Sequence, residues 1–126
     1  MIVVDSSGWI EYFSRSSTGL KYSSYIEKIN QLIVPSLVVY EVYKWIKRHH
    51  DEEEALKYIA QMHEAQFASL DDSLALHAAD ISLEHKLAMA DAIVYATALS
   101  YNAKLVTSDN DFQNLPHIIY LAKEKE

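Results

Sequence analysis

Apolar positions along this chain fall into two patterns, short continuous runs and longer stretches with helical spacing. The continuous runs are rich in β-branched residues and are bounded by turn residues, which is typical of buried strands. Pro116 precedes the last run, which we expect to be an edge strand. The expected strands are Ile2–Asp5, Leu32–Val34, Gln66–Leu70, Lys104–Thr107 and Ile118–Leu121.

Between these runs, apolar residues recur every three or four positions and predict helices. Ser36 and either Asp71 or Asp72 are suited to cap two of them, and Asn102 is suited to end another. The expected helices lie around Trp9–Phe13, over Lys21–Asn30, Leu37–His50, Ser73–Lys86 and Ala90–Tyr101, with one more that opens at Asp51. Strands that alternate with helices predict one α/β domain over residues 1–126, an α/β/α sandwich with a mostly parallel central sheet.

The same spacing predicts which helix faces pack inward. In the helix that opens at Asp51, the residues expected to face the core are Leu56, Ile59, Ala60 and either Met62 or His63. In the helix over Ser73–Lys86, they are Leu76, Ala79, Ile81 and Leu83.

Composition narrows the class of protein. Half of the 126 residues are hydrophobic, which is enough to build a core. The chain has no cysteine, its N-terminus lacks the features of a signal peptide, and no run approaches the length of a membrane span. These features fit a cytoplasmic protein that does not enter the membrane. The formal net charge of −7 argues against a uniformly basic nucleic-acid surface.

Carboxylates recur where predicted strands end. Asp5 follows the first strand, Glu41 lies early in the helix after Pro35, and Asp91 lies in the first turn of its helix. Asp109 and Asp111 follow the strand that ends at Thr107. In a parallel sheet these strand ends share one edge, so the acids can converge and would then repel one another. A hard divalent cation, Mg²⁺ or Mn²⁺, resolves that repulsion, because it prefers oxygen ligands and can bridge carboxylates to a phosphodiester.

Each acid also has an ordinary structural interpretation. Asp5 can cap a helix, Glu41 can pair with Lys44, Asp91 can favour a helix N-terminus, and Asp109 can form an Asx turn. Only their joint placement indicates a site.

Four segments together resemble the PIN domain family, in particular the VapC-type toxins of toxin–antitoxin pairs. They are VVDSS, VPSLVVYEV, LAMADAIVYATAL and LVTSDNDF, in the family's order and over nearly the whole chain. The resemblance maps the family's acids to Asp5, Glu41, Asp91 and Asp109, and it makes Asp111 a more variable, supporting acid. It implies an Mg²⁺- or Mn²⁺-dependent endoribonuclease that an antitoxin inhibits and that often forms a homodimer.

Within that resemblance, Asp5, Asp91 and Asp109 are the expected metal ligands, and a metal-activated water would hydrolyse the RNA phosphodiester. The hydroxyl groups of Ser6 and Thr107 are candidates to hydrogen-bond the carboxylates or a ligand water.

Two further groups are candidates for substrate contacts. Lys44 and Arg48 share a helix face with Glu41 and could contact RNA phosphates, or they could be a solvated flank. Tyr40 and Tyr43 could meet RNA bases or a partner chain.

Three alternatives remain open. A receiver-like phosphoacceptor domain is also small, acidic and Mg²⁺-binding, but it needs an aspartate after a strand near mid-chain, where this chain has DEEEALKYIAQMHE. A PIN-like module could bind nucleic acid or protein with little catalysis. A nuclease with the same acids could act on DNA, because the metal mechanism does not require the ribose 2′-hydroxyl.

Overall fold

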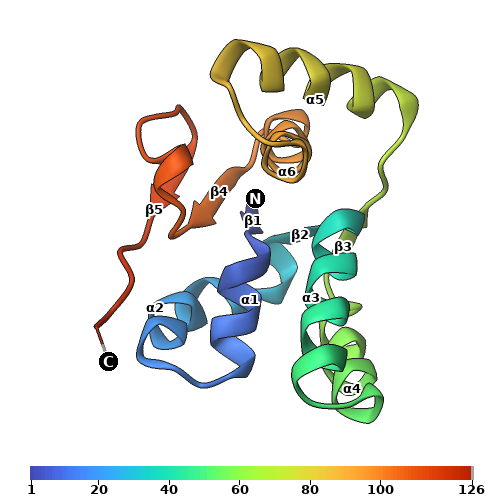
Figure 1. The fold of residues 1–126 in the computed structure, drawn as a ribbon, viewed down its shortest axis with the longest axis vertical. Coiled ribbons are helices and arrows are strands. Elements are labelled where there is room, and N and C mark those ends of the chain that lie inside the picture. The colour runs from blue at the N-terminus through green and yellow to red at the C-terminus, as the bar shows by residue number, and fades with distance from the viewer. Residues whose placement is uncertain (126) are drawn as a thin grey trace.

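The computed structural model describes residues 1–125 and is built on a five-stranded sheet (Figure 1). Its strands are β1 (Ile2–Val4), β2 (Leu32–Pro35), β3 (Gln66–Ala68), β4 (Lys104–Thr107) and β5 (Ile118–Tyr120). They lie in the order β3-β2-β1-β4-β5, and all four pairings are parallel. Val3 at the centre lies opposite Ile33 of β2 and Leu105 of β4. The predicted parallel α/β sheet is therefore confirmed.

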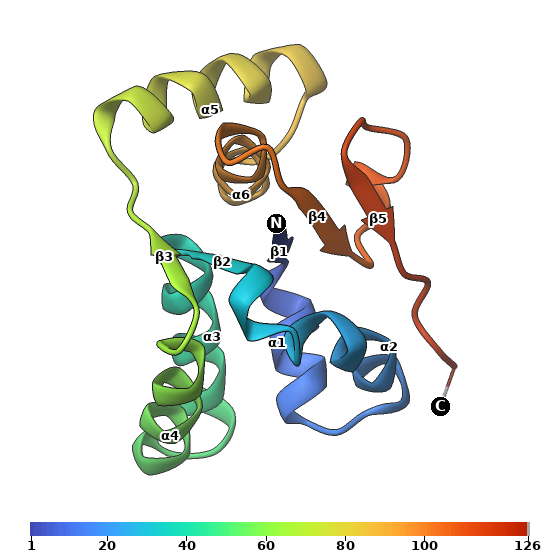
Figure 2. The ribbon, with the colours of Figure 1, turned by 180° about the vertical axis from the view of Figure 1, so that it is seen from behind.

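Six helices cover this sheet. They are α1 (Ser6–Phe13), α2 (Ser17–Ile26), α3 (Ser36–His49), α4 (Glu52–Met62), α5 (Asp72–His85) and α6 (Met89–Ser100). Two 3₁₀ turns, η1 (Ile29–Gln31) and η2 (Asn110–Phe112), complete the elements. Helices α5 and α6 lie on one side of the sheet and α1 to α4 on the other, which gives the predicted α/β/α layering (Figures 1 and 2). Within residues 1–125, no helix has both the length and the apolar character that crossing a bilayer requires.

The core lies between the central strands and the helices on both faces. The valines of β1 and the side chains of Leu105 and Val106 in β4 are fully buried. Large aromatic side chains from the covering elements complete the packing, namely Trp9, Tyr22, Tyr95 and Phe112. The burial of apolar side chains on both faces explains why the central strands read as continuous apolar runs.

The second helix differs from its predicted bounds. It begins at Ser17, where a helix was expected from Lys21, and it ends at Ile26 rather than Asn30. The hydroxyl group of Ser16 accepts a hydrogen bond from the Gly19 amide and so caps the helix. The segment before Lys21 has little apolar character, so the spacing of apolar residues does not indicate the first turn of α2.

Ser36 does not cap α3, contrary to the prediction. It is the first residue of the helix, Pro35 occupies the capping position, and no side chain caps this end. The Ser36 hydroxyl instead donates to the carbonyl oxygen of Ala68, 3.2 Å away on β3. A tertiary contact between neighbouring strand ends has therefore replaced the local one. Of the two predicted candidates, Asp71 caps α5, and its carboxylate accepts the Leu74 amide at 2.8 Å. The helix expected to open at Asp51 is capped by that residue, whose carboxylate accepts the Glu54 amide at 2.8 Å.

Several predicted inward positions face solvent instead. Among the residues predicted to face inward, Leu56 and Ala60 on α4 and Leu76, Ala79 and Leu83 on α5 are exposed. Of the two alternatives at the end of α4, Met62 is buried and His63 is exposed. The buried residues are Ala55, Ile59 and Met62 on α4 and Leu74, Ala78 and Ile81 on α5. Both helices carry apolar residues on two faces, so helical spacing alone could not identify the face that packs against the core.

Gly19 is required where α2 crosses α1. A Cβ atom at this position would lie 2.2 Å from the backbone carbonyl oxygen of Glu11. A Gly-to-Ala change inside a helix normally stabilises by about 1 kcal/mol through helix propensity. We expect Gly19→Ala to lower the free energy of unfolding by about 1–3 kcal/mol, because the helix backbones must move apart. Urea denaturation measures this free energy, with Ser24→Ala at an exposed position of α2 as the control. A Gly19→Ala variant as stable as this control would contradict the close approach of the two helices.

Candidate metal centre

Asp5 lies where β1 ends and α1 begins. Its Oδ1 atom accepts a hydrogen bond from the Ser6 amide at 2.8 Å, which caps α1. Its Oδ2 atom accepts a hydrogen bond from the Thr107 hydroxyl at 2.9 Å. The side chain is buried, and burial raises the pKa of its carboxyl group, while these two hydrogen bonds act in the opposite direction. Asp5 thus holds a fixed orientation across the ends of β1 and β4.

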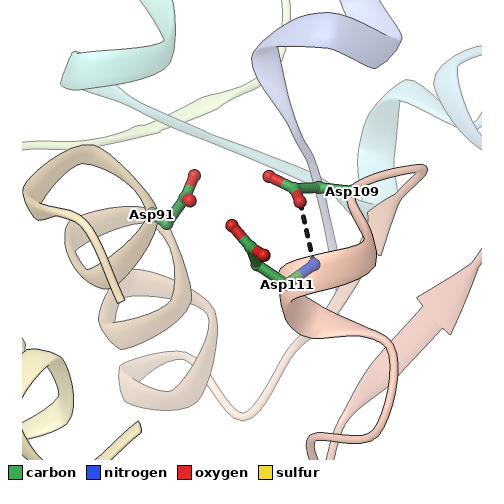
Figure 3. A group of neighbouring side chains, drawn as sticks. All are labelled: Asp91, Asp109 and Asp111. Atoms are coloured by element: carbon green, nitrogen blue, oxygen red, sulfur yellow. Dashed lines mark hydrogen bonds between the residues drawn. The ribbon is translucent and has the colours of Figure 1, made fainter. Parts of the chain in front are cut away.

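The segment after β4 is organised by the same threonine. The Thr107 hydroxyl oxygen accepts the Asp109 amide at 3.0 Å, and the Asp109 carboxylate accepts the Asp111 amide at 2.9 Å. The second bond starts the η2 turn. It directs the carboxylates of Asp109 and Asp111, which are separated by one residue, toward the same side (Figure 3). Asp109 is half-buried and Asp111 is exposed.

Asp91 faces these two acids from α6. It lies in the first turn of a helix that packs on β4, β1 and β2. One oxygen from each of Asp91, Asp109 and Asp111 lies within 4.8 Å of the other two, and the three carboxylates point into a shared space (Figure 3). Three oxygen ligands at this separation suit a hard divalent cation.

Glu41 approaches the same region from α3. Its side chain is half-buried, and burial raises the pKa of its carboxyl group. A hydrogen bond from the Ser6 side chain lowers that pKa, and the charge of Asp5 raises it. Ser6 thus links Glu41 to the segment that carries Asp5.

Within the described part of the chain, no ion pair supplies these acids with a compensating positive charge. The ion pairs recorded in residues 1–125 are Lys21–Glu124, Lys47–Glu52 and His85–Glu84, and none involves these five acids. Burial, followed by the charges of Asp109, Asp5, Asp111 and Glu41, raises the pKa of Asp91 to about 6. Asp91 therefore takes up a proton more readily than an ordinary aspartate, and at neutral pH, where it is mostly ionised, a cation would relieve the repulsion between the acids.

The five acids expected from the sequence all lie in this region, but their contacts differ. The tightest group contains Asp111 together with Asp91 and Asp109, whereas both oxygens of Asp5 accept hydrogen bonds from protein groups. Lys44 and Arg48 lie farther along α3, in a groove that begins at Ser6 and Glu41. The assignment of individual ligands remains a prediction.

Two residues that support the site were not identified from the sequence. The Tyr22 hydroxyl forms a 2.6 Å hydrogen bond with the Ser108 hydroxyl, which precedes Asp109. Both side chains are buried, and burial raises the pKa of Tyr22 to about 12, so the phenol stays protonated. Ser108 lay within a recognised motif, but no local pattern connects it with a tyrosine 86 residues earlier.

Comparisons with known proteins identify a matching family profile and similar folds. The profile of the PIN domain matches residues 2–118. A chain of a toxin–antitoxin complex from Klebsiella pneumoniae superimposes with a TM-score of 0.82 at 21% identity, over 94% of this chain and 96% of that one. The sarcin–ricin loop cleaving toxin VapC20 from Mycobacterium tuberculosis gives a TM-score of 0.78 at 16% identity, over 98% of this chain and 100% of that one.

A third similar structure is VapBC2 from Rickettsia felis, bound to a DNA fragment from its promoter. It gives a TM-score of 0.74 at 15% identity, over 97% of this chain and 98% of that chain. The comparison with curated proteins finds no match. At these identities, the structural likeness establishes the fold.

The raised pKa of Asp91 predicts a pH-dependent stability for the metal-free protein. The folded protein holds this proton more tightly than the unfolded chain, so stability falls as pH rises from about 4 through 6. In EDTA at pH 7.5, we expect Asp91→Asn to raise the free energy of unfolding by about 1 kcal/mol, a value discounted because the half-exposed carboxylate is screened by solvent.

At pH 4 the same substitution should have little effect, because the wild-type carboxyl group is already protonated. The matched control is Asp80→Asn, an identical change at an exposed position of α5. Urea denaturation at the two pH values measures both variants. A stability change of Asp91→Asn that is equal at both pH values would contradict repulsion among the acids.

Proposed function

The chain belongs to the PIN domain family, and on that premise we propose that it is an Mg²⁺- or Mn²⁺-dependent endoribonuclease. Within this proposal it acts in the cytoplasm as the toxin of a VapBC-type toxin–antitoxin pair. The observation that carries the proposal is the group of Asp91, Asp109 and Asp111. One oxygen from each lies within 4.8 Å of the other two, and no ion pair in residues 1–125 involves these acids. Such a group is costly unless a cation binds there.

The residues fit a hard divalent cation. Asp91 and Asp109 belong both to the ligand set expected from the resemblance and to the tightest group in the structure, so we assign them the direct contacts. Asp5 and Asp111 complete the oxygen-rich surroundings, one fixed by Thr107 and the other placed by the η2 turn. A bound cation would neutralise charge at phosphorus, activate a water and stabilise the leaving oxygen.

The protein side chains have separate parts in this reaction. Glu41, with its raised pKa, is a candidate to accept a proton from the attacking water. Thr107 orients Asp5 and the Asp109 backbone, and Ser6 orients Glu41. No group in this arrangement needs the RNA 2′-hydroxyl, so the expected product carries a 5′-phosphate.

Protein partners form part of the proposal. Two of the similar structures are toxin–antitoxin assemblies, which supports a cognate antitoxin for this chain. Leu76, Leu83 and Met89 are 70%, 82% and 74% exposed on α5 and the start of α6, which supports a homodimer contact there. Sedimentation of the wild type beside Leu83→Asp tests this contact, and a wild-type monomer at micromolar concentration would contradict it.

Catalysis is tested by incubating total RNA with the protein and millimolar Mg²⁺ or Mn²⁺. We expect cleavage that EDTA abolishes and that Asp91→Asn lowers by at least about 100-fold, because transition-state charge loses its neutralisation. Mapping the ends should show 5′-phosphates. Asp80→Asn, with the same loss of charge on exposed α5, should cleave like the wild type.

Cation binding is measured separately from cleavage. At a concentration about tenfold above Kd, the cation should stabilise by about 1.4 kcal/mol and raise Tm by about 3–6 °C. A cation-dependent Tm shift without cleavage would favour the binding-module alternative, and cleavage of DNA but not RNA would favour a DNA nuclease. RNA cleavage retained by Asp91→Asn would refute the assigned site.

A further inference from the structure

The outer face of α3 concentrates positive charge in an acidic protein. Lys44, Lys47 and Arg48 are exposed within five consecutive positions, although the whole chain has a net charge of −7. The chain contains no acid from Val42 to His50. Neither Lys44 nor Arg48 forms an ion pair with any residue in the described part of the chain, and Lys47 pairs only with Glu52 at 3.4 Å. These cations are therefore available to an external anion.

Aromatic rings alternate with these cations. Tyr40 is 57% exposed, and the Lys44 Nζ atom lies 5.5 Å from its ring centroid and 3.3 Å from its hydroxyl group. Similarly, the Lys47 Nζ atom lies 5.6 Å from the ring centroid of Tyr43. Cations beside an open aromatic face are the combination that binds single-stranded nucleic acid, through phosphate contacts and base stacking.

A groove joins this face to Glu41, one of the five acids. It has a volume of about 470 Å³, lies between α1 and α3, and runs from Ser6 and Glu41 to Lys44 and Arg48. A second hollow of about 490 Å³ is lined by Tyr40, Tyr43, Lys44, Lys47 and Arg48. Lys44, Arg48 and Tyr40 line both hollows. Arg48 follows Glu41 by seven residues, or about 10 Å along the helix axis.

Helix electrostatics explain only part of this cluster. Basic side chains near a helix C-terminus are favourable, which accounts for Lys47, Arg48 and His49 in the last turn of α3. Lys44 and Tyr40 lie outside that turn and gain nothing from it. The position of the helix end therefore does not explain why these two residues are exposed beside a groove that leads to Glu41.

We propose that the outer face of α3 binds one flank of the RNA as an unpaired strand, with Lys44 and Arg48 on phosphates and a base stacked on Tyr40. Lys47 adds positive charge near the C-terminal end of α3. The placement of the cut phosphate at the acids rests on the proposed function, whereas binding to this face does not. An acidic protein segment fits less well, because it makes no use of the exposed ring.

The experiment measures the binding of a labelled, unstructured RNA oligonucleotide by anisotropy at several salt concentrations, in an Asp91→Asn background that leaves the RNA uncut. Lys44→Gln/Arg48→Gln should weaken binding by at least about tenfold and reduce the salt slope by about 1.4, since each lost phosphate contact contributes roughly 0.7. The matched control, Lys28→Gln/Lys57→Gln, removes two exposed positive charges elsewhere and should leave both values unchanged.

The ring is tested by a second pair of variants. Tyr40→Ala should weaken binding by about fivefold or more, equivalent to the roughly 1 kcal/mol that one base–aromatic stack contributes. Tyr40→Phe should retain affinity, because stacking needs the ring and not the hydroxyl group. Duplex RNA and poly-glutamate should compete more weakly than single-stranded RNA.

The inference is overturned by equal losses in the two double variants, by full affinity in Tyr40→Ala, or by poly-glutamate competing as well as RNA. If the wild type cleaves RNA with metal while the α3 variants bind and cleave normally, this inference alone fails. If RNA binds to α3 but is not cut, the binding face stands and the nuclease function fails.

Discussion

Parallel pairing of β1 with both β2 and β4 is the constraint on which the site depends. It places the carboxyl ends of three neighbouring strands at one edge, where Asp5, the start of α3 and the Thr107–Asp109 segment follow directly. An antiparallel neighbour would send its acid to the opposite edge. The hydrogen bond from Thr107 to Asp5 joins residues 102 positions apart, and it exists only because β1 and β4 lie side by side.

The clustering of acids at this edge is electrostatically unfavourable, and packing in the rest of the fold holds the acids there. Burial raises the pKa of Asp5, Glu41 and Asp91, so each carboxylate is harder to ionise in the folded protein than in water. The strand residues Val4 and Val106 beneath them are fully buried, and the Tyr22–Ser108 hydrogen bond anchors the segment before Asp109 from the core side. The repulsion between the acids therefore persists in the folded protein, because the rigid sheet prevents them from moving apart. In the proposed function, a bound cation would relieve it.

The sequence predicted the parts of this arrangement that are encoded locally. Apolar runs identified the strands, and the side chains of Asp51 and Asp71 marked helix starts, because strand burial and N-caps depend on neighbouring residues. The predictions that were wrong concern residues whose positions depend on tertiary contacts. Ser36 hydrogen-bonds to β3 instead of capping α3, and Leu76 and Leu83 lie on the second apolar face of α5. The Tyr22–Ser108 contact and the position of Asp111 beside Asp91 likewise required the folded chain.

Net charge is a poor guide to the partner of this protein, because the charges are unevenly distributed. A net charge of −7 repels a polyanion at long range, but screening limits this effect to about 8 Å at physiological ionic strength. In the proposed complex, a phosphate in the groove between α1 and α3 would meet Lys44 and Arg48, and the acids beside Glu41 would meet it through a cation. Because α3 carries both Glu41 and these basic residues, one rigid element would set the distance between the reacting phosphate and the RNA strand bound at this face. A change that tilts α3 should therefore disturb binding and catalysis together, whereas a change in η2 should disturb the acids alone.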